Sequence, residues 1–125
     1  MNRGGSDMKR IELDKFLSEG NDFLSGRPEG EMARNREGLD EYDLTKDGNK
    51  IILIISDNII GINISFFLGL LSISLKPFHT REEILAKVKL EFSGNDEEIK
   101  EVITEDFEYM IKKVLDKRDI DDILK

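Results

Sequence analysis

Five consecutive apolar residues at positions 51–55, in the order Ile-Ile-Leu-Ile-Ile, constrain the fold of this chain more than any other feature. Four of the five are β-branched, and the turn-forming residues Asp47, Gly48 and Asn49 come shortly before them. A short β-branched run next to turn signals is typical of a strand that is buried on both faces in a parallel sheet. The sequence therefore predicts a central strand at this position.

Strand-like and helix-like patterns alternate on both sides of this run. Ile11 and Leu13 alternate with charged residues, as do Val88, Leu90 and Phe92, and this alternation is typical of half-exposed strands. Apolar spacing and capping residues predict helices over 27–38, 65–76, 80–86 and 95–115. The order of elements predicts an α/β fold, namely a small mixed, mostly parallel sheet with helices packed on it.

Residues with short polar side chains predict where these helices begin. Ser25 or Gly26 can cap the first helix, and Pro28 lies in its first turn, where a proline removes no intrahelical hydrogen bond. At Ser65 the spacing of apolar residues changes from alternation to helical periodicity, so we expect Ser65 to be an N-cap. Thr80 opens a capping-box pattern, and Asn95 is the expected cap of the last helix.

The length of 125 residues predicts one domain. We expect the loop over 18–26 to be anchored in the core by Phe23 and Leu24. The predicted organisation is a flexible tail, the α/β domain and a charged tail, at 1–8, 9–117 and 118–125.

The 18 uncharged residues at 58–75 are long enough to be tested as a membrane span. Several asparagines and serines interrupt the stretch, and its periodicity changes at its middle, which a single spanning helix would not show. We therefore expect a buried strand followed by a buried helix, with no membrane association. The N-terminus has no apolar signal segment, and this together with the lack of cysteine favours the cytoplasm.

Composition excludes several classes of function. The net charge of −8 argues against nucleic acid as a partner, because such binders need basic surfaces. The absence of cysteine excludes thiolate metal sites and cysteine nucleophiles, and a single histidine leaves little scope for a histidine-based site. The sequence therefore predicts no catalytic residue, no metal site and no cofactor.

The acidic segment before the central strand resembles half of a calcium-binding loop. Asp43, Thr45, Asp47 and Gly48 match the first part of an EF-hand pattern, but Ile54 occupies the position that requires a bidentate glutamate. We therefore expect a solvated turn at this segment.

Two places in the sequence could carry function. Ser65 can be an N-cap, a phosphorylation site or a nucleophile, although the Gly-x-Ser-x-Gly pattern of a nucleophile elbow is absent. Ser25, Arg27 and Arg34 can form an anion or nucleotide site at the start of the first helix, or the arginines can form salt bridges with nearby glutamates.

The residues at 51–57, the extended segment 60–64 and the sequence Ser-Phe-Phe-Leu-Gly-Leu-Leu at 65–71 resemble the STAS-like domains of prokaryotes, which are related to anti-sigma-factor antagonists. The segment 26–34, with its arginines and glycine, is also similar to a segment of these proteins. The resemblance covers residues 9–115 and implies the same order of strands and helices.

The resemblance implies a non-enzymatic module that docks a protein partner through Asn58, Asn63 and Ser65, beside the N-terminus of the Ser65 helix. In the antagonists, a kinase phosphorylates the first serine of an Asp-Ser-Ser/Thr-Gly motif. Here Ile64 occupies that position and cannot accept phosphate, so the resemblance does not carry the kinase switch over to this chain. The resemblance suggests a histidine-kinase-type ATPase or another regulator as the partner, and it leaves a homo-oligomer open.

Overall fold

The computed structural model describes the backbone of residues 8–124 and the side chains of residues 8–116. The tail expected at 1–8 therefore lies outside the described residues except for Met8, which begins the first strand. The elements in chain order are β1 (Met8–Glu12), η1 (Leu13–Phe16), β2 (Phe23–Leu24), α1 (Arg27–Arg36), η2 (Leu39–Glu41), β3 (Lys50–Ser56), β4 (Gly61–Ile62), α2 (Ile64–Leu71), α3 (Arg81–Lys87), β5 (Val88–Ser93) and α4 (Glu97–Leu124).

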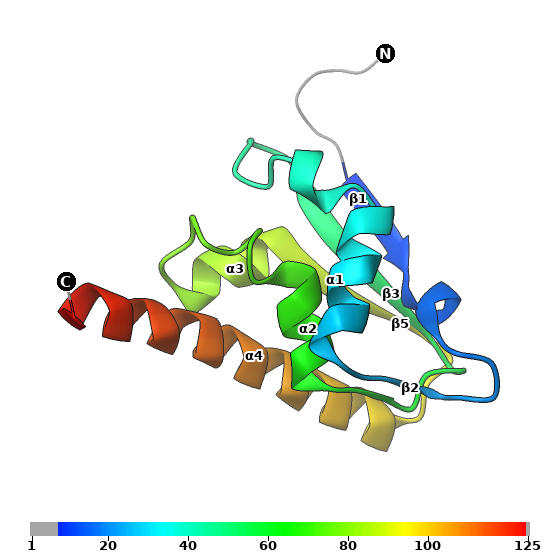
Figure 1. Cartoon of the computed structure of the whole chain (residues 1–125). Helices are drawn as coiled ribbons and strands as arrows, with labels where there is room; N and C mark the ends of the chain where they lie inside the picture. Colours follow the sequence, from blue (N-terminus) through cyan, green and yellow to red (C-terminus); the bar gives the residue numbers. More distant parts are fainter. Residues whose placement is uncertain (1–7, 125) are drawn as a thin grey trace, which may run out of the picture.

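The predicted α/β fold with a mostly parallel sheet is confirmed. The main sheet has the strand order β1-β3-β5 with both pairs parallel, and β2 and β4 form a separate parallel ribbon. Because the chain moves across the main sheet in one direction, right-handed crossovers place both connections on the same face. Figure 1 accordingly shows α1, α2 and α4 on one side of the sheet.

The strand β3 is central, as predicted, but helices cover only one of its faces. Ile51, Leu53 and Ile55 are fully buried on the helix-covered face. On the other face Ile52 is buried and Ile54 is half-buried. The prediction of burial on both faces is therefore correct for Ile52 and wrong for Ile54.

Long side chains replace a helix layer on that outer face. Arg10 lies opposite Ile52 on one side of β3, and Glu91 lies opposite Ile54 on the other. Their side chains form an ion pair of 2.9 Å between the two outer strands.

The uncharged segment 58–75 forms β4 and then α2, as the change of periodicity predicted. Phe66, Phe67, Leu70 and Leu71 are fully buried, so the apolar character of this segment serves the core. No helix in the described part of the chain combines the length and the apolar character that crossing a bilayer requires.

The predicted N-cap of α2 is wrong by two residues. Asn63 is the cap, because its Oδ1 accepts a hydrogen bond of 2.7 Å from the backbone N–H of Ser65. The helix consequently begins at Ile64, and Ser65 lies within its first turn. The expected cap of the last helix is also wrong, because α4 begins at Glu97 and Asn95 instead donates its side-chain amide to the carbonyls of Ser56 and Ile59.

Other helix starts agree with the sequence. The helix α1 begins at Arg27 with Pro28 in its first turn, and both hydrogen bonds of the predicted capping box between Thr80 and Glu83 are present at α3. The helix α4 continues through Leu124, so the backbone of the expected C-terminal tail at 118–124 extends this helix.

The loop over 18–26 contains the short strand β2, which the sequence did not predict. Its partner is β4, with Phe23 opposite Gly61 and Leu24 opposite Ile62. Leu24 is buried, as expected for an anchor, whereas Phe23 is 52% exposed, so the prediction that Phe23 anchors the loop is wrong.

Two glycines allow α1 and α2 to touch at backbone distance. A Cβ atom on Gly30 would collide with the backbone of α2 at Phe66, and a Cβ atom on Gly69 would collide with the backbone of α1 at Arg27. Any larger residue at either position would push the helices apart. This contact fixes the two helices side by side, as Figure 1 shows.

Candidate functional site

The helices α1 and α2 both begin at one edge of the helix layer. Each follows a strand of the β2–β4 ribbon, and the carbonyl of Leu24 accepts a hydrogen bond of 2.8 Å from the N–H of Asn63. This pairing brings the segments that lead into the two helices together, although they are far apart in sequence. We call this region the helix-start edge and define it by Ser25, Gly26, Asn63 and Ser65.

The start of α2 is open to solvent. Asn63 and Ser65 are exposed, and the first turn of α2 contains no acidic residue. A helix N-terminus carries partial positive charge and backbone N–H groups that lack intrahelical partners. The N–H groups of Ser65, Phe66 and Phe67 bond to Asn63, so the start of α2 offers an external group its positive dipole end and its exposed polar side chains.

The start of α1 is covered by one of its own side chains. Gly26 precedes the helix with φ of 95° and offers no capping side chain. The Glu29 carboxylate lies against Gly26, where a Cβ atom would collide with it. A carboxylate at this position complements the helix dipole. The position at which an external anion would bind is therefore occupied by the chain itself.

Arg27 points along α2 instead of toward the helix-start edge. Its Nη2 donates a hydrogen bond of 3.5 Å to Ser72, and its Nε lies 3.6 Å from the Glu31 carboxylate. Ser25, which the sequence grouped with Arg27, is exposed before the helix.

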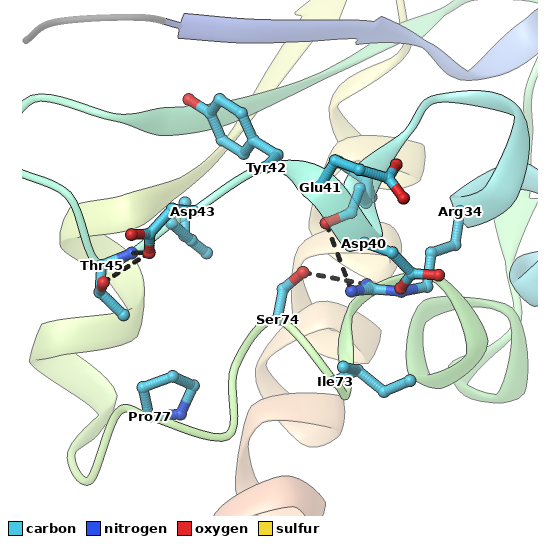
Figure 2. Close-up of a pocket in the computed structure, with 11 residues that line it drawn as sticks. Arg34, Asp40, Glu41, Tyr42, Asp43, Thr45, Ile73, Ser74 and Pro77 are labelled. Atoms are coloured by element: carbon cyan, nitrogen blue, oxygen red, sulfur yellow. Dashed lines mark hydrogen bonds and ion pairs between the residues drawn. The ribbon is translucent and has the colours of Figure 1, made fainter.

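Arg34 lies at the other end of α1 and is buried, with 4% exposure. Its guanidinium donates to the Asp40 carboxylate at 2.7 Å, to the Leu70 carbonyl at 2.9 Å and to the Ser74 hydroxyl at 2.9 Å. Figure 2 shows it between η2 and the turn after α2. The structure therefore does not bring Arg34 together with Ser25 and Arg27 in one anion site. The salt-bridge alternative describes Arg27, whose partner is Glu31, whereas Arg34 pairs with Asp40 and not with one of the predicted glutamates.

A pocket of about 300 Å³ lies over Arg34 (Figure 2). The segment after α1 and the turn after α2 line it, with Asp40, Asp43, Ile73 and Pro77 among the lining residues. The Arg34 guanidinium at this pocket hydrogen-bonds to protein atoms, so its donors serve to join the surrounding segments.

The acidic loop beside this pocket is held by hydrogen bonds within the chain. Asp43 accepts bonds from the backbone and the hydroxyl of Thr45, and these bonds lower the pKa of the Asp43 carboxyl below its usual value. The Lys87 ammonium donates to the carbonyls of Lys46 at 2.9 Å and Asn49 at 3.2 Å. Loop carbonyls that could face a cation are thus bonded to a lysine of the chain.

Within residues 8–116 no group of three or more histidine or carboxylate side chains converges as a metal site would require. A second hollow, of about 460 Å³, lies between α3 and the later part of α4. Arg81 and Glu108 line it and pair with each other at 2.6 Å, which raises the pKa of Arg81. Tyr109 also lines this hollow and is 48% exposed.

The predicted docking residues do not form one compact cluster. Asn63 and Ser65 lie at the helix-start edge, whereas Asn58 lies in the turn after β3, where its N–H donates to the Ser56 hydroxyl. The extended chain between Asn58 and Asn63 spans at most about 17 Å. All three side chains are exposed.

Two apolar residues whose exposure the sequence did not predict lie on or next to the ribbon, Phe23 in β2 and Ile60 just before β4. Phe23 is 52% exposed, and Ile60 is 40% exposed. The Phe23 ring lies over Gly61, where a Cβ atom would overlap it. A glycine opposite an aromatic residue is the sequence signal for this arrangement. The signal can be recognised only when the β2–β4 register is known.

Comparison of the chain with known protein families, with curated proteins and with solved structures finds no match. The STAS-like resemblance therefore stays a prediction.

Proposed function

We propose that this protein is a non-enzymatic regulatory domain of STAS-like type that docks a protein partner at the N-terminus of α2, in the cytoplasm. The open start of α2 beside the exposed ribbon residues is the observation that carries the proposal. Its partner is a protein, and a histidine-kinase-type ATPase or another regulator is the candidate that the resemblance suggests.

The surface has the composition of a docking site. Exposed aromatic and large aliphatic side chains act as anchors at interfaces, and polar groups surround them. Phe23 and Ile60 supply exposed apolar area on the ribbon, and Asn58, Asn63 and Ser65 supply polar groups at its two ends. A carboxylate or carbonyl of the partner fits the positive end of α2, which has no acidic residue in its first turn.

The surface is also held rigidly. The backbone contact at Gly30 and Gly69 fixes α2 against α1, and the Asn63 cap fixes the first turn of α2. A surface that is ordered before binding loses less conformational entropy when a partner docks. This rigidity supports recognition by shape at the helix-start edge.

The test compares partner retention by matched variants of the full chain in extract from cells that produce it. Ser65→Arg adds a bulky charge at an exposed site that does not cap the helix, and Lys112→Glu changes charge on the exposed surface of α4. We expect the wild type and Lys112→Glu to retain the same partner equally, and Ser65→Arg to retain at least tenfold less with an unchanged melting temperature.

A second variant separates docking from chemistry at the serine. Ser65→Ala removes the hydroxyl but adds no bulk, so partner retention is expected to stay at the wild-type level. Equal retention by Ser65→Arg would show that the partner docks elsewhere, and loss of retention by Ser65→Ala would show that the hydroxyl itself is required.

A further inference from the structure

The two outer strands of the main sheet differ in whether a charged residue points inward at the unpaired edge. In the described part of the chain, β1 and β5 each pair only with β3, so each leaves one row of backbone groups without a strand partner. Natural sheets protect such edges with bulges, prolines or charged residues that point inward. On β1, Lys9 lies opposite the fully buried Ile51, on the face that the helices cover. The edge at β1 therefore carries an inward charge.

The edge at β5 has no bulge, no proline and no inward-pointing charge, and its charged residues Lys89 and Glu91 lie on the other face. Val88, Leu90 and Phe92 lie on the helix-covered face, opposite Ile51, Leu53 and Ile55, and the register with β3 runs from Val88 to Ser93 without a bulge. Leu90 and Phe92 are only half-buried although they face the helix layer. A strand added beside β5 would cover apolar area that the chain alone leaves exposed.

The charges on the other face of β5 complement a second copy of the same strand. In an antiparallel pair centred on Leu90, Lys89 lies opposite Glu91 of the second copy, and Val88 lies opposite its Phe92. Opposite charges stabilise cross-strand pairs, whereas like charges destabilise them. Within the described residues Lys89 makes no ion pair, and Glu91 pairs with Arg10 across β3. The second copy would thus supply the missing partner of Lys89.

The same charges disfavour neighbouring registers. A pair centred on Lys89 would place two lysines opposite each other, and a pair centred on Glu91 would place two glutamates opposite each other. The charges of β5 therefore favour the register centred on Leu90 over both of these neighbouring registers.

We propose that two copies of this chain associate through antiparallel pairing of β5 with β5, centred on Leu90, so that one sheet runs through both copies. The pairing is isologous, since each copy contributes the same residues. It uses the edge of the main sheet, so it does not depend on the docking function proposed for the start of α2.

The first test measures the mass of the full chain in solution over a range of concentrations. We expect the wild type to form a dimer, and we expect Lys89→Glu, which places two glutamates opposite each other, to raise the dimer dissociation constant at least tenfold. Lys112→Glu, with the same change of net charge on α4, is expected to dimerise like the wild type. The double variant Lys89→Glu with Glu91→Lys restores opposite charges between the copies at the loss of the Arg10–Glu91 pair within each copy, and it is expected to dimerise more tightly than Lys89→Glu alone.

The second test uses the absence of cysteine from the chain, which makes any disulfide specific to an introduced residue. Leu90→Cys lies opposite itself in the proposed register, so mild oxidation is expected to link two copies. Met32→Cys, which is exposed on α1, is expected to give at most a trace of linked product. A wild type that stays monomeric at every concentration, or a Lys89→Glu variant that dimerises like the wild type, would overturn the proposal. Equal linking at positions 32 and 90 would also count against it.

Discussion

The helices α1 and α2 begin side by side, yet their starts differ in what they leave open. Both follow a strand of the β2–β4 ribbon, and both are fixed by the contact between Gly30 and Gly69. The start of α1 has no side-chain cap and is covered by Glu29, whereas the start of α2 is capped by Asn63 and has no acidic residue in its first turn.

This difference shows that two helices that begin side by side can differ in how open their starts are. The residues of the first turn decide whether the helix dipole is satisfied within the chain or is left for a partner. At the start of α1, Glu29 occupies the position where an external anion would bind. The start of α2 is accessible, and Ser65 and the ribbon residue Phe23 are exposed there.

We expect the greatest loss of stability from a substitution that forces α1 and α2 apart. Gly69→Val introduces atoms where the backbone of α1 lies, so we expect the free energy of unfolding to fall by about 3 kcal/mol, at the upper end of overpacking effects. Urea denaturation measures this loss. Ala86→Val, at an exposed position of α3, serves as the control and is expected to change stability by no more than about 0.5 kcal/mol. Comparable stability of the two variants would contradict the close contact.

A somewhat smaller loss of stability is expected where Arg34 joins the other ends of the two helices. Arg34→Met removes a buried guanidinium that bonds Asp40, the Leu70 carbonyl and Ser74, and leaves their oxygens without this donor. We expect a loss of about 2 kcal/mol, since unsatisfied buried polar groups and charges are costly. Thermal and urea unfolding measure it. Arg34→Lys is expected to recover little, because one ammonium cannot reach all three acceptors. Wild-type stability in Arg34→Met would refute this role.

A smaller effect distinguishes the capped helix from the uncapped one. Asn63→Ala removes the acceptor for the Ser65 N–H and is expected to cost about 1 kcal/mol, whereas Asn63→Asp keeps the acceptor and is expected to keep the stability. Ser25→Ala, before α1, is the matched control and is expected to have little effect, since no side chain caps α1. Equal losses of stability in Asn63→Ala and Ser25→Ala would contradict the conclusion that a side chain caps α2 but not α1.

Neutralising the Glu29 carboxylate tests whether the start of α1 contributes to stability without contributing to docking. Glu29→Gln removes the negative charge from the start of α1, and we expect a loss of about 0.5 kcal/mol that decreases as salt is added. Retention of the partner is expected to stay unchanged, because the proposed docking surface lies at α2. A Glu29→Gln variant that loses the partner would place docking at α1.

The smallest effect concerns the acidic loop, which lies away from both helix starts. Hydrogen bonds from Thr45 lower the pKa of Asp43 in the folded protein below the ordinary value of 3.8. A group whose pKa falls on folding adds stability above its unfolded pKa and loses it as the pH drops through the folded value. Unfolding measured below pH 3.8 should therefore show a smaller acid-induced loss in Thr45→Val than in the wild type. Identical pH profiles would contradict this cause.

Much of the fold could be predicted because its signals are local. The run at 51–55 marked β3, and the Thr80 capping box marked α3. The error at α2 is also local: Asn63 and Ser65 are both good N-caps, and the alternation that ends at Ile64 suggested that the strand pattern continued past the true cap.

The site was harder to predict because its contacts join distant segments. The strand β2 has two residues, which is too short to show periodicity, so its pairing with β4 and the exposure of Phe23 could not be expected. Arg34 finds acceptors at Leu70 and Ser74, on the turn after another helix. The contact of Gly30 with Gly69 likewise depends on how two helices pack, which a single sequence does not specify.

Site-specific photocrosslinking in the cells that make the protein tests the docking surface most directly. A photoreactive phenylalanine analogue replaces either Phe23, on the ribbon, or Tyr109, on α4, two aromatic residues of similar exposure at 52% and 48%. We expect a covalent adduct with another protein from position 23, its loss when Ser65→Arg is added, and no such adduct from position 109. An adduct that forms at position 109 and is absent at position 23 would contradict the proposed docking surface.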